Sequence, residues 1–133
     1  MATIKRFEDL EIWKKARDLE NNIFSLTENG KLSKDYKLLA QLNSASGSVM
    51  DNIAEGFGRG GRLEFVQFLS ISRGSASELQ SQLYRCLDRK YILVKQFQEL
   101  YEMADEICKM ITGFIVYLNK SEHKGQKFKE RTK

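Results

Sequence analysis

Apolar residues recur at helical spacing over most of this 133-residue chain. Side chains that step by three and four residues along one face predict helices over about 9–26, 35–56, 62–90 and 94–119. No stretch alternates between apolar and polar residues for long enough to indicate a strand. Because long helices with short connections pack against their sequence neighbours, we expect one all-α domain over 1–119, an antiparallel up-down-up-down four-helix bundle.

The same spacing gives the core side of each predicted helix. These positions are Ile12, Ala16, Leu19, Ile23 and Leu26 in the first helix, Leu38, Leu42, Ala45, Val49 and Ile53 in the second, Phe65, Leu69, Ser72, Ala76, Leu79, Leu83 and Leu87 in the third, and Phe97, Leu100, Ala104, Ile107, Ile111, Phe114 and Leu118 in the fourth. Ser33 lies two residues before the second pattern, and we expect it to cap that helix.

The stretch DNIAEGFGRGG, residues 51–61, contains four glycines and raises the question of a phosphate-binding loop. Such loops place their glycines after a buried strand, and the Walker type also needs a Lys-Ser/Thr pair. Here a helix precedes the glycines and no lysine follows, so we interpret the stretch as a turn between two helices, with Gly56 near the helix end. An anion at the start of the third helix, beside Arg59 and Arg62, is the alternative.

Small residues on the two arms of this turn predict closely packed helices. With the turn centred near residue 59 or 60, residues 44–48 lie opposite residues 70–75, and both segments are mostly serine, alanine and glycine. Glycine inside a helix costs about 1 kcal/mol relative to alanine. Gly47 and Gly74 are therefore expected where helices approach closely or where a partner's side chain packs.

Polar residues follow the same seam between the second and third helices. They are Gln41, Ser48, Asn52, Glu55 and Arg73. We interpret them as a structural hydrogen-bond network that fixes the helix register, with Glu55 paired to Arg59 four residues on. A semi-buried site built from Asn52, Glu55 and Arg73 is the alternative.

The net charge of +4 lies in one segment of the sequence. From Lys120 onward there are six basic and two acidic residues, whereas residues 1–119 hold 16 of each. We therefore expect a neutral folded body and a basic, disordered tail over 120–133, which either contacts an acidic partner or only keeps the chain soluble. No apolar stretch approaches the ~20 residues of a membrane span, so we expect a cytoplasmic protein with no membrane partner.

The residue inventory argues against enzyme chemistry. The only histidine, His123, lies in the tail, so the body offers no Glu-x-x-His pair for a di-iron site and no Ser-His or Cys-His nucleophile pair. Cys86 and Cys108 are too few for a zinc site and about nine residues out of register for a disulfide. We expect no catalytic residue, no metal and no cofactor, and two free thiols.

Three sequence blocks resemble a known family. FEDLEIWKKARDLENNIF, QLNSASGSVMDNIAEGFGRG and FLSISRGSASELQSQL are similar to the signature blocks of the 23S rRNA-intervening-sequence proteins, over about residues 7–118. The resemblance implies a four-helix bundle that assembles as a homopentamer in bacteria. The chain is similar also to the accessory variability determinant of diversity-generating retroelements, a pentameric bundle that binds nucleic acid and a reverse transcriptase. It departs from the family pattern at Asn43-Ser44, where arginine is usual.

These residues leave two functions open: an oligomeric scaffold that binds RNA or DNA through weak basic sites, and a protein-interaction scaffold with no nucleic-acid role. The candidate nucleic-acid residues are Arg59, Arg62, Arg85, Arg89, Lys90, Lys124, Lys127 and Lys129. No aromatic-basic motif is expected to read bases, so binding should be weak and non-specific. The candidate oligomer contact, an apolar second seam on the fourth helix, comprises Met103, Met110, Ile115, Val116 and Tyr117.

Overall fold

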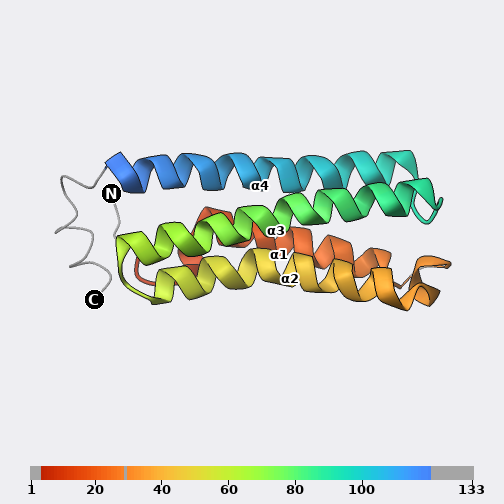
Figure 1. Cartoon of the computed structure of the whole chain (residues 1–133), viewed down its shortest axis with the longest axis horizontal. Coiled ribbons are helices and arrows are strands. Elements are labelled where there is room, and N and C mark those ends of the chain that lie inside the picture. The colour runs from red at the N-terminus through yellow and green to blue at the C-terminus, as the bar shows by residue number, and fades with distance from the viewer. Residues whose placement is uncertain (1–3, 29, 121–133) are drawn as a thin grey trace.

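The structure, a computed structural model, describes residues 4–28 and 30–120, and these form helices and connections with no strand among them (Figure 1). In chain order the elements are η1 (Phe7–Asp9), α1 (Glu11–Leu26), η2 (Leu32–Lys34), α2 (Tyr36–Gly58), α3 (Arg62–Asp88) and α4 (Val94–Lys120). The expectation of four helices is confirmed. In Figure 1, α1 and α3 run one way along the long axis, and α2 and α4 run the other way.

This arrangement gives the bundle two ends. The α2–α3 end, at the left of Figure 1, contains the turn 59–61, the start of α1 and the end of α4. The α3–α4 end, at the right, contains the turn 89–93 and the connection between α1 and α2.

The core is formed by the predicted apolar faces. Nearly every predicted core position is buried, including the hydroxyl of Ser72, which donates to the carbonyl oxygen of Val49 on α2 at 2.6 Å. Leu87 and Phe114 are only half-buried and pack against the core from its edge. Next to the half-buried Leu87, the side chain of Cys86 is fully buried and contributes to the core in this turn of α3.

The two helices approach closely at Gly56, just before the α2–α3 turn. A Cβ atom added there would lie 2.6 Å from the Cβ of Phe68 and 3.1 Å from the Cδ1 of Phe65, so only glycine fits without moving α3. Gly60 completes the turn with a φ of +83°, in the left-handed region that glycine tolerates.

Close helix approach at Gly47 and Gly74 was a wrong expectation. A Cβ atom added at either position would meet no heavy atom within 4 Å, because both glycines face away from the neighbouring helices. The arms do meet nearby, where the hydroxyls of Ser48 and Ser75 lie 2.9 Å apart. This pairing centres the turn near residue 61, one to two residues later than predicted. The close contact of the two helices lies nearer the turn, at Gly56.

The cap of α2 also differs from the expectation. Asp35 is the N-cap, and its carboxylate accepts the backbone N–H of Leu38 at 3.3 Å. Ser33 lies inside the short 3-10 helix η2, and its hydroxyl donates to the carbonyl of Gly30 at 2.6 Å. That extra helical turn places the aspartate, rather than the serine, at the position from which a side chain reaches the first amides of α2.

Candidate nucleic-acid interface

The structure places the predicted basic residues at opposite ends of the bundle. Arg59 and Arg62 lie at the α2–α3 end, where Arg62 donates to the side-chain oxygen of Asn119 on α4 at 3.1 Å. Arg85, Arg89 and Lys90 lie at the α3–α4 end, at the close of α3. The tail residues Lys124, Lys127 and Lys129 lie outside the described residues. The described candidates therefore do not form one surface.

The α3–α4 end carries a concentration of positive charge that the sequence had not revealed. Residues 27–38 and 84–96 contain seven basic residues, Lys31, Lys34, Lys37, Arg85, Arg89, Lys90 and Lys95, against three acidic residues, Glu28, Asp35 and Asp88. All other described residues hold ten basic and thirteen acidic side chains. The body is close to neutral as a sum, but its charge is polarised toward this end.

Asp35 joins the two segments that form the α3–α4 end. Its carboxylate accepts from Nη1 of Arg89 at 2.8 Å and from the hydroxyl of Tyr91 at 2.9 Å, while it also caps α2. The pKa of Asp35 lies below its ordinary value, mainly because the Tyr91 hydroxyl donates a hydrogen bond to the carboxylate. The Leu38 amide and the charge of Arg89 lower this pKa further. The same carboxylate raises the pKa of the Tyr91 hydroxyl. The α3–α4 turn is thus fastened to the start of α2.

A second bond fixes the helix beside this turn. Nη2 of Arg85 on α3 donates to the side-chain oxygen of Gln41 on α2 at 2.7 Å. The guanidinium groups of Arg85 and Arg89 therefore link the end of α3 to the start of α2 by hydrogen bonds. Among the described residues, the five lysines of this end form no salt bridge, and they are exposed.

Lys90 has a backbone conformation that favours glycine. Its φ is +59°, and it ends α3 in a Schellman motif. In this motif the backbone N–H of Tyr91 donates to the carbonyl oxygen of Cys86 at 2.9 Å, and the backbone N–H of Lys90 donates to the carbonyl oxygen of Leu87 at 3.0 Å. A non-glycine residue in the left-handed region costs roughly 1–2 kcal/mol. A lysine at this position is therefore unfavourable for the fold and adds a cation to the α3–α4 end.

The polar seam predicted between α2 and α3 is divided into separate contacts. The Asn52 amide donates to the Ser48 hydroxyl at 2.8 Å, and Ser48 contacts Ser75 across the helices. Glu55 pairs with Arg59 at 2.9 Å on the surface, as expected. Gln41 instead accepts from Arg85, and Arg73 donates to Thr112 on α4 at 3.0 Å. Asn52, Glu55 and Arg73, the residues of the alternative site, each bind a different partner.

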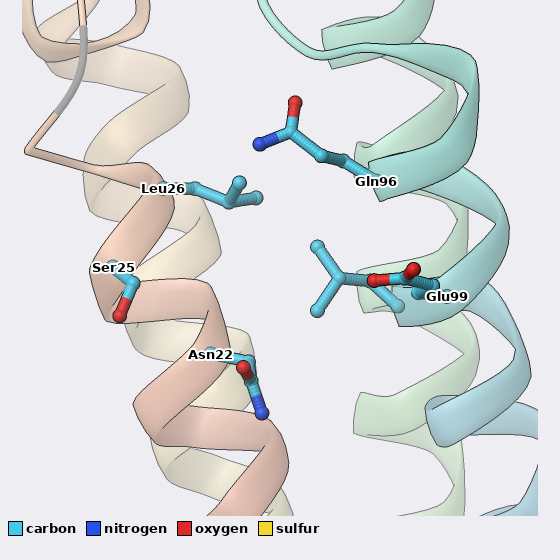
Figure 2. Close-up of a pocket in the computed structure, with 6 residues that line it drawn as sticks. Asn22, Ser25, Leu26, Gln96 and Glu99 are labelled. Carbon is cyan, nitrogen blue, oxygen red and sulfur yellow. The ribbon is translucent and has the colours of Figure 1, made fainter.

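An open cavity of about 170 Å³ lies between α1 and α4, lined by Asn22, Ser25, Leu26, Gln96, Glu99 and Leu100. Figure 2 shows Asn22, Ser25 and Leu26 on one helix, with Gln96 and Glu99 facing them from the other. Glu99 is its single ionisable group, and the Asn22 amide donates to the Asp18 carbonyl at 2.8 Å. The lining contains no nucleophile-base pair. Over residues 4–28 and 30–120, no three potential metal ligands cluster, and no helix is long and apolar enough to cross a membrane.

The cysteines are both free, as predicted. Cys86 is buried in the core, and burial raises the pKa of its thiol to about 11. Cys108 is half-buried on α4, and burial raises the pKa of its thiol as well. Neither thiol has the depressed pKa of a reactive nucleophile.

The apolar residues predicted as a second seam on α4 are not equivalent. Met103, Met110 and Ile115 are half-buried against the bundle's own core, and the Met103 sulfur accepts from Asn22 of α1 at 3.8 Å. Val116 and Tyr117 are exposed. At Met103 the predicted second seam faces α1, because α1 covers that flank of α4. Of the five seam residues, only Val116 and Tyr117, in the last turns of the helix, are exposed.

The four packed helices, without a strand or a metal-ligand cluster in the described part of the chain, define a small all-helical protein. The chain belongs to the 23S rRNA-intervening sequence protein family, which it matches over residues 8–113. A solved structure of similar fold is that of a protein of unknown function from the S23 ribosomal protein family of Bacteroides thetaiotaomicron. Its TM-score is 0.71 at 22% sequence identity, and the match covers 78% of this chain and 97% of that one. No curated protein matches the chain.

Proposed function

We propose that this protein is a non-catalytic, oligomeric scaffold of the cytoplasm that binds nucleic acid through the α3–α4 end. The observation that carries the proposal is the excess of four positive charges there, set against an acidic excess in the other described residues. Phosphate contacts supply most of non-specific nucleic-acid affinity, and exposed lysines are suited to them. The family's description as rRNA-intervening sequence proteins favours RNA as the first nucleic acid to test.

The expected binding is weak for a single chain and depends on salt. If all five lysines of this end contact phosphates, affinity for a single strand should fall roughly 100-fold between 50 and 200 mM salt. The tail from residue 120 lies outside the described residues except for Lys120, which ends α4 at the opposite end of the bundle. Removing residues 121–133 should lower affinity and flatten its salt dependence, and an unchanged slope would remove the tail from the mechanism.

Oligomerisation would compensate for weak single sites through avidity. Two kinds of surface residue support a self-association surface. Val116 and Tyr117 are exposed apolar side chains near the end of α4. Gly47, Gly74 and Gly113 lie inside helices, where glycine is unfavourable, although no atom of a neighbouring helix lies within 4 Å of an added Cβ. A neighbouring subunit packing on these positions accounts for the glycines, and the family resemblance implies a closed ring of five.

Charge variants test the nucleic-acid proposal. K31Q/K34Q/K37Q removes three lysines from the α3–α4 end, and the control K14Q/K15Q/K109Q removes three exposed lysines elsewhere, so both variants have the same net charge. RNA affinity is measured by fluorescence anisotropy between 50 and 200 mM salt. The first variant should bind more weakly, with a salt slope reduced by about 2, since each lost contact removes roughly 0.7. Equal losses in both variants would contradict the proposed location.

Lys90→Gly provides a test in which stability and binding move in opposite directions. Glycine relieves the left-handed conformation and should stabilise the fold by about 1 kcal/mol, while it removes one phosphate contact. The melting temperature should therefore rise as RNA affinity falls. Higher stability with unchanged affinity would leave Lys90 outside the interface.

A protein-interaction scaffold without nucleic acid is the second candidate, and the exposed Val116 and Tyr117 favour it. Retention of cellular proteins on the tagged chain, compared with and without nuclease treatment, separates the two functions. Partners that remain after nuclease treatment, with no nucleic acid recovered beforehand, would favour this second function.

A further inference from the structure

Large apolar side chains lie exposed between the lysines of the α3–α4 end. Tyr36, the first residue of α2, is 76% exposed, and Leu93 and Val94 at the start of α4 are 70% and 60% exposed. In sequence each group is enclosed by lysines, as Lys34-Asp-Tyr-Lys37 and Lys90-Tyr-Ile-Leu-Val-Lys95. Single exposed apolar residues are ordinary, but at the most basic end of the bundle these three lie between lysines in the sequence.

The contacts of Asp35 join the two segments that carry these side chains at one end of the bundle. Asp35 immediately precedes Tyr36, and its carboxylate binds Tyr91, which lies two residues before Leu93. The backbone N–H of Leu93 donates to the side-chain oxygen of Gln96 at 2.8 Å, which fixes the first turn of α4. The two segments are therefore held in place at the same end, and lysines flank each apolar group in the sequence.

We infer that the α3–α4 end binds single-stranded nucleic acid in preference to duplex, with Tyr36 stacking on an unpaired base while the lysines contact the flanking phosphates. This inference rests on the proposed function and adds the class of nucleic acid. Proteins that bind single strands combine cationic side chains along the backbone with aromatic side chains that stack on the bases. A duplex keeps its base faces stacked inside the helix, so it would meet the lysines and leave the apolar side chains without a contact.

Charge alone predicts the opposite preference, which makes the inference testable. A duplex has a higher density of phosphates than a single strand, so a surface that recognised phosphates only would bind the duplex at least as tightly. An anionic lipid surface is the other partner that suits lysines and protruding apolar residues. Exposed Glu28 and Asp88 at the same end would face its headgroups, and the apolar residues are divided between two connections instead of lining one amphipathic helix.

The experiment compares a 20-nucleotide labelled RNA of mixed sequence with the same strand in a duplex, by fluorescence anisotropy on the full chain. The variants are Tyr36→Ser, Tyr36→Phe and Leu93→Ser. Leu63→Ser is the control for Leu93→Ser, because Leu63 is equally exposed and lies at the opposite end of the bundle. The parent should prefer the single strand. Tyr36→Ser should lower single-strand affinity about 5- to 100-fold with little effect on the duplex, and Tyr36→Phe should retain the affinity. Leu93→Ser should weaken single-strand binding more than Leu63→Ser.

The outcomes separate this inference from the proposed function. Equal or tighter binding of the duplex, or equal losses by Tyr36→Ser on both RNAs, would overturn the single-strand inference and leave nucleic-acid binding in place. Failure to bind either RNA at 50 mM salt would overturn both. A parallel sedimentation assay uses vesicles of phosphatidylcholine and phosphatidylserine. Co-sedimentation that Leu93→Ser abolishes, without RNA binding, would assign this surface to lipid and overturn the inference.

Discussion

Replacement of Gly56 by alanine should destabilise the bundle, although alanine is the better helix former. The added Cβ would lie 2.6 Å from the Cβ of Phe68, which is fixed to the α3 backbone and cannot turn away. Carbon atoms in contact normally lie about 3.5–4.0 Å apart, so the two helices would have to separate by roughly 1 Å at the turn.

The magnitude follows from two opposing effects. Overpacking of this kind costs typically about 1–3 kcal/mol, whereas the change from glycine to alanine gains at most ~1 kcal/mol within a helix. The gain is smaller at Gly56, which lies in the last turn of α2. We expect a net destabilisation of about 1–2 kcal/mol. For a chain of this length that lowers the melting temperature by about 4–7 °C.

The control is Gly47→Ala, a change of the same residue type in the middle of the same helix. Its Cβ would meet no atom of the neighbouring helices within 4 Å, so within a single chain only the helix-propensity gain remains, and the melting temperature of the monomer should rise by about 4 °C. If a second subunit packs on Gly47, as proposed above, the alanine should weaken the assembly instead. Both variants are melted by circular dichroism at one protein concentration, and their masses are checked by light scattering. Equal stabilisation by the two alanines would refute the close contact at Gly56. A lower mass for Gly47→Ala would place that glycine in a subunit interface.

Three further predictions concern other parts of the chain. The pKa of Asp35 is lowered in the fold, so the carboxylate stabilises the fold fully above the ordinary aspartate pKa of about 3.9, and this stabilisation is lost as the pH falls through the pKa of the folded state. In acid titrations monitored by circular dichroism, Asp35→Asn should therefore lose less stability over that pH range than the parent. Cys86 should label with a thiol reagent far more slowly than Cys108 in the native protein, and both should label fully after denaturation without reductant; labelling that requires reductant would contradict the free thiols. Val116→Glu or Tyr117→Glu should lower the mass of the assembly in light scattering, and an unchanged oligomer would place the contact elsewhere.

The sequence was sufficient for the helices and their core faces because both follow from local spacing. Helical periodicity determines which side of each helix is apolar, and residues such as Ile23, Leu69 and Ile107 are buried as that rule requires. The glycine-rich turn was likewise predictable, since no strand precedes it. The register of α2 against α3 was less accurate, by one to two residues. Gly47 and Gly74 were assigned a close contact because they lie nearly opposite each other across the turn, but each lies on a side of its own helix that does not meet the neighbouring helix.

The basic α3–α4 end could not be predicted from charge along the chain. Lys34 and Arg85 are separated by 51 residues, and only the packing of α2 against α3 brings their segments together. In the net charge of residues 1–119, the positive charge of this end is cancelled by acidic residues elsewhere, such as Glu102 and Asp105 on α4. The regular spacing of Lys31, Lys34 and Lys37 was the available signal.

The placement of the α2–α3 end determines how the protein can be immobilised. The start of α1 and the end of α4 both lie at this end, and α4 alone extends roughly 40 Å from it, at 1.5 Å for each of its 27 residues (Figure 1). An attachment point placed directly before residue 4 or directly after residue 120 would therefore hold the protein on a bead or sensor surface by the end opposite Tyr36 and Lys90. Surface-based binding measurements should then agree with those in solution without a long linker.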